Sequence, residues 1–343
     1  MSNSPATTIP KGSLVLVTGA TSFIASHIIK QFLERGYKVL GTVRDLEKAA
    51  FLTEELFADY AKKGDLELTV VSDLGAPNTF DHALKGRNVA AIVHVASPMT
   101  FDPDPSKVIP QTVAGATGLL RAAALEPSVK RFVYTSSAAT VFEHEAGTPA
   151  HITKDSWNNR AVKAAWAPPP HGPIQGAVVY AASKTEAERA IWKFVDEETP
   201  AFAVNSVLPY FTLGESLHKT LVRSSNRLLH GLANGNVGLL GSIPGTHYIN
   251  IKDVATAHVA GVLDADVQGQ RLFLWSSAFT FNDVLAILRK KYPNRTFIDD
   301  LPDQIKDIST KDDAPVLALL KKWAGQDDWI SFEQTIDEVF EGY

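Results

Sequence analysis

Tyr180 and Lys184 stand four residues apart in the segment Tyr180-Ala-Ala-Ser-Lys184. On a helix, residues at this spacing lie on the same face. A free phenol loses its proton near pH ~10, and a neighbouring ammonium lowers that pKa because it favours the phenolate. A tyrosine tuned in this way can exchange a proton with a substrate oxygen near neutral pH. The motif is short, so the structural alternative is a partly buried helical tyrosine beside a solvated lysine.

The elements that would position this pair alternate along the first half of the chain. Short apolar runs predict strands, and helical patterns lie between them. We expect strands at 13–18, 37–43, 66–71, 89–95, 130–135 and 202–208, a helix at about 106–124, and a helix that carries Tyr180 to about residue 197. The alternation predicts an α/β fold of the Rossmann type, a doubly wound parallel sheet with a smaller C-terminal substrate lobe. Ligands in such sheets bind beyond the carboxyl ends of the strands.

A glycine-bearing turn follows the first predicted strand. It reads Gly19-Ala-Thr21-Ser22-Phe23-Ile24 and leads directly into a helical pattern that ends at Gly36. Backbone N–H groups and the helix dipole at such a turn can hold a pyrophosphate. The turn therefore predicts a dinucleotide site.

Arg44 ends the second predicted strand, and Lys48 follows one helical turn later. An acid at this position suits the ribose hydroxyls of NAD, whereas a basic residue suits the additional phosphate of NADP. Arg44 therefore favours NADP(H), while the adjacent Asp45 keeps NAD open as an alternative. The structural alternative is a pair of solvated side chains at the start of a helix.

Other candidate residues fall at the same edge of the predicted sheet. Asp73 follows the third strand and could reach an adenine, Ala96 follows the fourth, and Ser136 and Ser137 follow the fifth. A hydroxyl after the fifth strand could hydrogen-bond a carbonyl oxygen held against Tyr180. The sequence does not decide which of the two serines faces the site.

Composition excludes several other classes. The net charge of −5 gives no indication of a nucleic-acid partner, and no apolar run reaches the ~18 residues of a membrane span. The 343 residues include no cysteine, which excludes thiol nucleophiles and thiolate metal sites. His144, His151 and His171 lack metal-ligand spacing, so we expect no metal. We expect a cytoplasmic protein, either monomer or homodimer.

Taken together, the motifs resemble those of extended short-chain dehydrogenases/reductases. The matching pieces are Thr18-Gly19-x-x-x-Phe23-Ile24-Ala25, His94-Val-Ala-Ser97, Phe132-Val-Tyr-Thr-Ser-Ser137, Tyr180-x-x-x-Lys184 and Leu208-Pro209. They cover roughly residues 13–265. Within that family the chain is most similar to fungal and yeast NADPH-dependent aldehyde and ketone reductases, which are related to dihydroflavonol reductases.

The resemblance implies an NADPH-dependent reduction of a small carbonyl substrate. Ser137 would polarise the carbonyl, Tyr180 would donate a proton, and Lys184 would bind the nicotinamide ribose and lower the phenol pKa. It implies cofactor contacts at Gly19, Thr21, Ser22, Phe23, Ile24, Arg44, Lys48, Asp73, Leu74, Ala96, Ser97, Thr135, Ser136, Tyr180, Lys184 and Pro209. It implies substrate contacts at Ser97, Pro98, Thr140, Tyr210, Phe211 and Thr212.

Two features depart from the family pattern. Ser22 stands where the phosphate turn usually has a glycine, and its Cβ could crowd the pyrophosphate if the backbone needs a positive φ. Alternatively, its hydroxyl donates to a phosphate. No asparagine occurs between Asp104 and Ala124, where many members carry one for a proton relay. Any relay here would use water or a backbone carbonyl.

The division of the chain follows from the same patterns. We expect a flexible tail at 1–12, a dinucleotide-binding domain with the catalytic helix at 13–208, and mainly a substrate-binding lobe at 209–343, with 247–275 returning to the sheet. We also expect an irregular loop at 166–173, a glycine-rich rim at 231–245, Asp253 as a helix cap, and final helices packed on the lobe.

Two other functions stay open at this point. A sugar-nucleotide epimerase or dehydratase on the same scaffold could use Lys219, Arg223 and Arg227 to bind a diphosphate, although the apolar Tyr210-Phe211 favours a carbonyl substrate. A non-catalytic NADP(H)-sensing protein is the other alternative. Such proteins often lose the tyrosine or the lysine, and both are present here, which favours an active enzyme.

Overall fold

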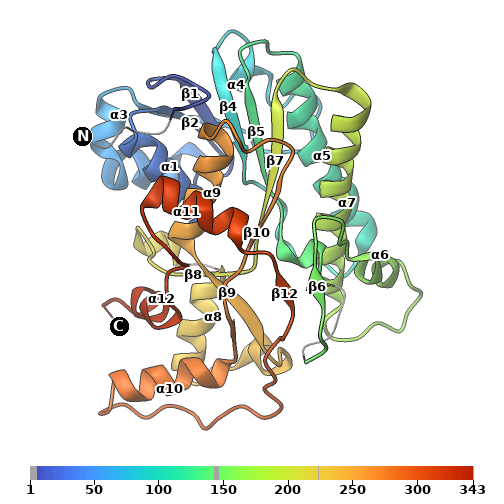
Figure 1. Cartoon of the computed structure of the whole chain (residues 1–343), viewed down its shortest axis with the longest axis vertical. Coiled ribbons are helices and arrows are strands. Elements are labelled where there is room, and N and C mark those ends of the chain that lie inside the picture. The colour runs from blue at the N-terminus through green and yellow to red at the C-terminus, as the bar shows by residue number, and fades with distance from the viewer. Residues whose placement is uncertain (1–5, 143–146, 223, 343) are drawn as a thin grey trace.

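Seven parallel strands form the central sheet of the protein (Figure 1). The structure is a computed structural model that describes residues 6–142, 147–222 and 224–342. The strand order is β10-β7-β5-β4-β1-β2-β3, and every neighbouring pair is parallel. The strands are β1 (Leu14–Val17), β2 (Lys38–Val43), β3 (Leu66–Val70), β4 (Val89–His94), β5 (Arg131–Thr135), β7 (Ala203–Pro209) and β10 (Arg271–Leu274).

The strands are apolar because both faces of the sheet are covered. Successive side chains of a strand point to opposite faces, so the central strands supply two cores. In β1, Val15 and Val17 pack into one cluster and Leu16 into the other. In β4, Val93 and Ile92 are divided in the same way.

Helices cover the two faces as a doubly wound sheet requires (Figure 1). One face carries α1 (Phe23–Glu34), α9 (Ile251–Leu263) and α11 (Ala314–Ala324), with α2 (Leu46–Phe51), a π-helical turn (Leu52–Leu56) and α3 (Ala58–Lys62) beside them. The other face carries α4 (Asp81–Leu84), α5 (Pro105–Ala124) and α7 (Gln175–Glu198), and α6 (Asn159–Ala165) packs on α7. The predicted α/β fold of the Rossmann type is confirmed.

A smaller set of elements lies beyond the sheet and has its own apolar core. It contains a three-stranded sheet of β11 (Ala278–Phe279), β9 (Thr246–Asn250) and β8 (Phe211–Leu213), together with α8 (Ser224–Ala233), α10 (Phe281–Lys291) and α12 (Phe332–Val339). Its core includes Leu213, Leu229, Tyr248, Leu285 and Ile336. A two-stranded ladder of β6 (His151–Ile152) and β12 (Thr310–Lys311) lies apart from it.

The described part of the expected N-terminal tail is fixed to the fold. Ile9 is 1% exposed, and its carbonyl accepts a hydrogen bond from the Tyr37 hydroxyl at 3.3 Å. The Thr8 N–H donates to the Leu263 carbonyl at the end of α9 at 3.0 Å. The expectation of a flexible segment is therefore wrong for residues 6–12, because an apolar side chain and backbone hydrogen bonds hold them.

Of the final helices, α10 and α12 pack in the smaller core as expected, whereas α11 packs on α9, which corrects our expectation for that helix alone. Val316 and Leu320 belong to the same apolar cluster as Val254 of α9. Lys322 and Trp323 donate to the Asp264 carboxylate at the end of α9, at 2.9 and 2.7 Å. The apolar stripe of α11 thus completes the cover of the large sheet.

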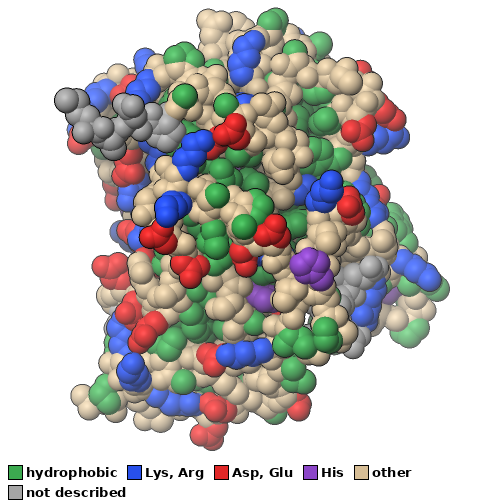
Figure 2. All heavy atoms as spheres, viewed as in Figure 1, with side chains coloured by type: hydrophobic (Ala, Val, Ile, Leu, Met, Phe, Trp, Pro, Cys, Tyr) green, Lys and Arg blue, Asp and Glu red, His purple; other side chains and the backbone are tan. Residues whose placement is uncertain are grey.

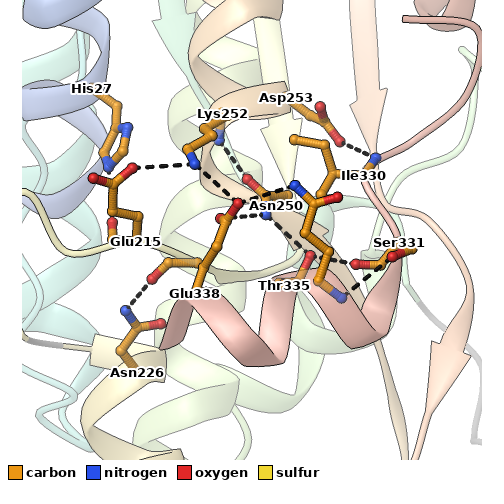
Figure 3. A network of polar contacts seen from close by, with 12 residues as sticks. His27, Glu215, Asn226, Asn250, Lys252, Asp253, Ile330, Ser331, Thr335 and Glu338 are labelled. Atoms are coloured by element: carbon orange, nitrogen blue, oxygen red, sulfur yellow. Dashed lines mark hydrogen bonds and ion pairs between the residues drawn. The ribbon is translucent and has the colours of Figure 1, made fainter. Parts of the chain in front are cut away.

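Figure 3 shows a polar network that joins the start of α9 to α12. Asn250 caps α9 by accepting from the Lys252 N–H at 2.8 Å, and its amide donates to Glu338 at 2.9 Å. Asp253, which we expected to be the cap, is fully buried and accepts from Gln326 and the Ile330 N–H instead. That expectation is wrong because the cap lies three residues earlier.

Residues 166–173 contain no helix or strand, in agreement with the expected irregular loop, while the preceding part of the segment between β5 and α7 contains α6 and a 3₁₀ turn at Ala138–Thr140. His151 and His171 are exposed, and His144 lies outside the described residues. Within the described ranges no group of side chains could hold a metal ion, and no helix is long and apolar enough to cross a membrane. Figure 2 shows acidic and basic side chains interspersed over one face of the molecule.

Candidate active site

The turn between β1 and α1 is shaped by close backbone approach. Gly19 has a φ of +68°, and a Cβ there would lie 3.2 Å from the Cα of Ala96. Only glycine combines this conformation with this approach. The first turn of α1 contains no acidic residue, so its N–H groups and dipole favour an anion. Thr21 and Ile24 are partly exposed in this turn, and Phe23 is buried.

The backbone conformation of Ser22 explains how a serine can stand where the phosphate turn usually has a glycine. Its φ is −93°, so the residue does not need the conformational freedom of glycine. Its hydroxyl accepts a hydrogen bond from the Ala25 N–H at 3.3 Å and caps α1. The side chain therefore serves the start of the helix.

His94 fixes the end of β4 next to this turn. Its Nδ1 lies 2.8 Å from the Thr18 hydroxyl, which in turn accepts from the Val95 and Ala96 N–H groups at 3.0 Å each. Burial, with a smaller effect of the Lys184 charge, lowers the pKa of His94 to about 3, so the ring is neutral. Ala96 is held against Gly19 by these contacts. The adjacent Ser97 has a buried hydroxyl oxygen without a hydrogen-bond partner among the described residues, and Pro98 is partly exposed.

The far end of the sheet edge is open to solvent. Arg44 is exposed, and within the described part of the chain its side chain forms no hydrogen bond or ion pair. Asp45 accepts from the Lys48 N–H at 3.1 Å and caps α2, and the Lys48 ammonium lies 3.5 Å from the same carboxylate. The acid is thus engaged by α2 and Lys48, whereas the Arg44 guanidinium is directed to solvent in the described part of the chain. Asp73 is also exposed, and Leu74 packs on α5 at Gly115.

Helix α7 presents Tyr180, Lys184 and Glu188 on successive turns of one face. The Ser137 side chain is close enough to the Tyr180 phenol to lower the pKa of that phenol, whereas the Ser136 hydroxyl donates to Glu188 at 2.7 Å. The structure thus brings Ser137, and not Ser136, to the phenol. The ring of Phe101 lies 5.2 Å from the Tyr180 ring, between centroids.

The phenol of Tyr180 is a weaker acid than we expected from its neighbour. Burial raises the pKa of Tyr180, and the nearby Ser137 side chain offsets only part of that rise. The direction is opposite to the one expected from an ammonium at i+4, because Lys184 points to other acceptors. At neutral pH the phenol therefore carries its proton, which is the form that a proton donor needs.

Lys184 is 3% exposed and bonded inside the protein. Its Nζ donates to the Thr135 carbonyl at 2.8 Å and to the Tyr134 hydroxyl at 3.0 Å. Burial lowers the pKa of Lys184 to about 7, against the charge of Glu188, which raises it. The Thr135 hydroxyl is bonded to His258 at 2.8 Å, so Thr135 serves this site through its carbonyl.

Glu188 was missed by the sequence reasoning and is the centre of a buried network. Its carboxylate pairs with the Arg271 Nε at 2.9 Å, and it accepts from Ser136, Thr140, Ser206 and Trp192. Burial alone would raise the pKa of Glu188, but Arg271 and the hydroxyl donors outweigh it and lower that pKa. The signal in the sequence was an acid four residues after Lys184, on the same face of the helix.

The expected substrate contacts after β7 are divided between two regions. Pro209 ends β7, and Tyr210 lies between Phe142, at 4.6 Å, and His247, at 5.9 Å between ring centroids. Phe211 packs on Phe279 in the smaller core, and the buried Thr212 donates to the Tyr210 carbonyl.

Thr140 does not lie where we expected a substrate contact. It is fully buried, and its hydroxyl donates to Glu188 at 3.0 Å, so the side chain faces the network and not an open site. Of the three basic residues considered for a diphosphate, Lys219 and Arg227 are exposed, and Arg223 lies outside the described residues.

The doubly wound sheet and the glycine turn after β1 define a dinucleotide-binding protein. A model of the NAD dependent epimerase/dehydratase family matches residues 15–272, and the chain belongs to this family. This confirms the resemblance to extended short-chain dehydrogenases/reductases.

Similar proteins extend over nearly the whole chain. Aldehyde reductase 2 of Sporidiobolus salmonicolor is 39% identical over 334 residues, which are 96% of each chain. The NAD-dependent epimerase/dehydratase terH of Aspergillus terreus is 38% identical over 335 residues, 97% of each. The crystal structure of yeast methylglyoxal/isovaleraldehyde reductase Gre2 complexed with NADPH matches with a TM-score of 0.75 and 28% identity, over 95% of this chain and 96% of that one.

Proposed function

We propose that the protein reduces aldehydes and ketones to alcohols with NADPH. The observation that carries this proposal is the placement of Tyr180 on α7 one helical turn before the buried Lys184, whose Nζ is fixed by the Thr135 carbonyl at 2.8 Å, at the sheet edge that also holds Ser137 and the phosphate turn. The similarity to aldehyde reductase 2 and to the Gre2 reductase supports the same reaction.

The residues fit a dinucleotide at this edge. Gly19 and Ala96 leave a backbone cradle that a Cβ would fill, and the N-terminus of α1 offers N–H groups to a pyrophosphate. Arg44 would hold the additional phosphate of NADP, because Asp45 is engaged as a cap. The nicotinamide, when bound, supplies the hydride.

The chain's own groups would then handle the carbonyl oxygen. Ser137 would donate a hydrogen bond to that oxygen and hold it against Tyr180. The Tyr180 phenol, whose raised pKa keeps it protonated, would give its proton to the developing alkoxide. Lys184 would direct its remaining N–H toward the ribose. In this arrangement the protein supplies position and electrostatics at the reacting oxygen.

A panel of aldehydes and ketones tests the proposal. Purified protein with NADPH should consume the reduced cofactor when a carbonyl compound is added, and much more slowly with NADH. NADPH that binds but is not consumed with any member of the panel would favour a sensing role. Interconversion of a nucleotide sugar without net cofactor consumption would favour the epimerase alternative, which the name of the terH relative keeps in view.

A further inference from the structure

Tyr134 contacts Lys184 from the neighbouring strand, and no role in the reaction proposed above requires it. Its hydroxyl oxygen accepts the Lys184 Nζ hydrogen bond at 3.0 Å, and Nζ lies 4.6 Å from the centre of its ring. The Thr135 carbonyl accepts a second hydrogen bond at 2.8 Å. An ammonium has three donors, so these two contacts leave one N–H for a ligand.

We propose that Tyr134 is a positioning residue that holds the Lys184 side chain as a charged, oriented ammonium. The inference rests on the role proposed for Lys184. The backbone carbonyl of Thr135 cannot be removed by substitution, whereas the Tyr134 hydroxyl can. Of the two acceptors, Tyr134 is therefore the one whose effect on the charge and orientation of Lys184 can be tested by substitution.

The ring of Tyr134 is itself fixed. The residue is 1% exposed in β5, packs in the cluster that contains Phe132 and Ile191, and lies 5.9 Å from the His94 ring between centroids. Burial, with smaller effects of Glu188 and Tyr180, raises the pKa of Tyr134 well above the ordinary value. The phenol therefore stays neutral and acts on the cation through its oxygen and its ring face.

The other titratable groups around Lys184 each keep one charge state near neutral pH. On α7 itself these are Tyr180, which is protonated at neutral pH, and Glu188, whose carboxylate is shared with Arg271 of β10. On β4, His94 is neutral. Helix α5 packs on α7, and the residues that α5 buries include no titratable side chain.

Loss of the Tyr134 hydroxyl should therefore lower the pKa of Lys184. The hydrogen bond exists with the ammonium, so its removal destabilises the charged form. A rate that requires the ammonium falls as the pH rises through the pKa of Lys184, which is about 7 in the folded protein. In Tyr134→Phe that fall should come earlier, by about one pH unit for one hydrogen bond to a charged group.

Tyr134→Phe keeps the ring and removes only the oxygen. Tyr37→Phe is the matched control, since Tyr37 is also buried, at 2% exposure, and donates to the Ile9 carbonyl at the far side of the sheet. We expect the upper limb of the pH profile for NADPH-dependent carbonyl reduction to move to lower pH in Tyr134→Phe and to stay in place in Tyr37→Phe. An unmoved limb in a folded Tyr134→Phe protein would overturn the inference.

A second measurement separates this inference from the proposed function. The ammonium of Lys184 can be titrated by NMR in lysine-labelled protein and assigned by the signal that is lost in Lys184→Met. The signal should titrate at lower pH in Tyr134→Phe than in the unmodified chain, and equal titration would overturn the inference whatever the activity. Full turnover in Lys184→Met would instead contradict the proposed function.

Discussion

The two ends of the candidate site are built in opposite ways along one sheet edge. At the catalytic end, the partly exposed Tyr180 precedes two buried residues, Lys184 and Glu188, which are bonded to a carbonyl, a phenol, hydroxyls and a guanidinium. At the end proposed for the adenosine, Arg44 and Lys48 are exposed, and Asp45 caps α2 and pairs with the Lys48 ammonium. The reacting groups are thus oriented by the fold, and the group proposed to select the cofactor is an exposed charge.

This difference has an energetic consequence. Buried polar groups are costly unless their partners are complete, so a lost partner at the catalytic end should damage the fold as well as the reaction. Exposed charges are screened by water and salt, so a change at the adenosine end should alter binding and leave stability almost unchanged. Each prediction below tests one side of this contrast.

Glu188→Gln should have the largest effect on stability. It leaves the Arg271 guanidinium, whose side chain is 7% exposed, without its carboxylate partner. Breaking a buried ion pair in this way costs roughly 3–5 kcal/mol of unfolding free energy. Urea denaturation measures it, with Lys48→Ala as the exposed control that should leave the midpoint nearly in place. A decrease in the denaturation midpoint no larger than that of Lys48→Ala would contradict the proposed difference between the two ends of the site.

Ser137→Ala should lower kcat without a comparable loss of stability. One hydrogen-bond donor to a reacting oxygen contributes about 10²–10³ in rate. Ser136→Ala is the neighbouring control, because its hydroxyl serves Glu188 and its loss should appear chiefly in the denaturation midpoint. If Ser136→Ala lost turnover and Ser137→Ala kept it, the two serines would have to exchange roles.

Arg44→Ala should weaken NADPH binding by roughly tenfold to a hundredfold, as expected for one hydrogen-bonded contact to a charged group. NADH binding should change little, since NADH lacks the phosphate that the guanidinium would meet. Fluorescence titration with both cofactors measures the two affinities. Equal losses for both would count against a phosphate contact at Arg44.

Ser22→Ala should cost about 1 kcal/mol of stability through the lost cap of α1, and Ser22→Gly only a few tenths. NADPH affinity should be nearly the same in both variants. A strong loss of NADPH affinity in Ser22→Ala would place the hydroxyl on a phosphate, which is the alternative that the sequence left open.

The sequence was sufficient to predict the α/β fold and six of the seven strands of the large sheet, β10 being the one not listed. Buried strands read as continuous apolar runs, and the turn after each strand places Gly19, Arg44, Asp73, Ala96 and Ser137 at one edge. Helix α5 begins at Pro105, within one residue of the expected start, because Asp104 supplies a cap.

The contacts that depend on side-chain direction were not predictable in the same way. The spacing of Tyr180 and Lys184 does not reveal that Nζ turns toward Tyr134 and Thr135, so the expected direction of the Tyr180 pKa was wrong. Ser136 and Ser137 are adjacent in sequence and differ in the direction of their side chains, of which that of Ser136 points to Glu188. The partner of Glu188, Arg271, is distant in sequence and meets it only through the strand order.

Tyr180→Phe tests the central claim most directly. The substitution removes the phenolic oxygen and leaves the Lys184 contacts and the phosphate turn in place. Turnover of NADPH with a carbonyl substrate should fall by about 10²–10⁴, the usual contribution of a positioned proton donor, while the Kd for NADPH stays nearly the same. Turnover close to that of the unmodified chain, with NADPH bound as before, would contradict the account.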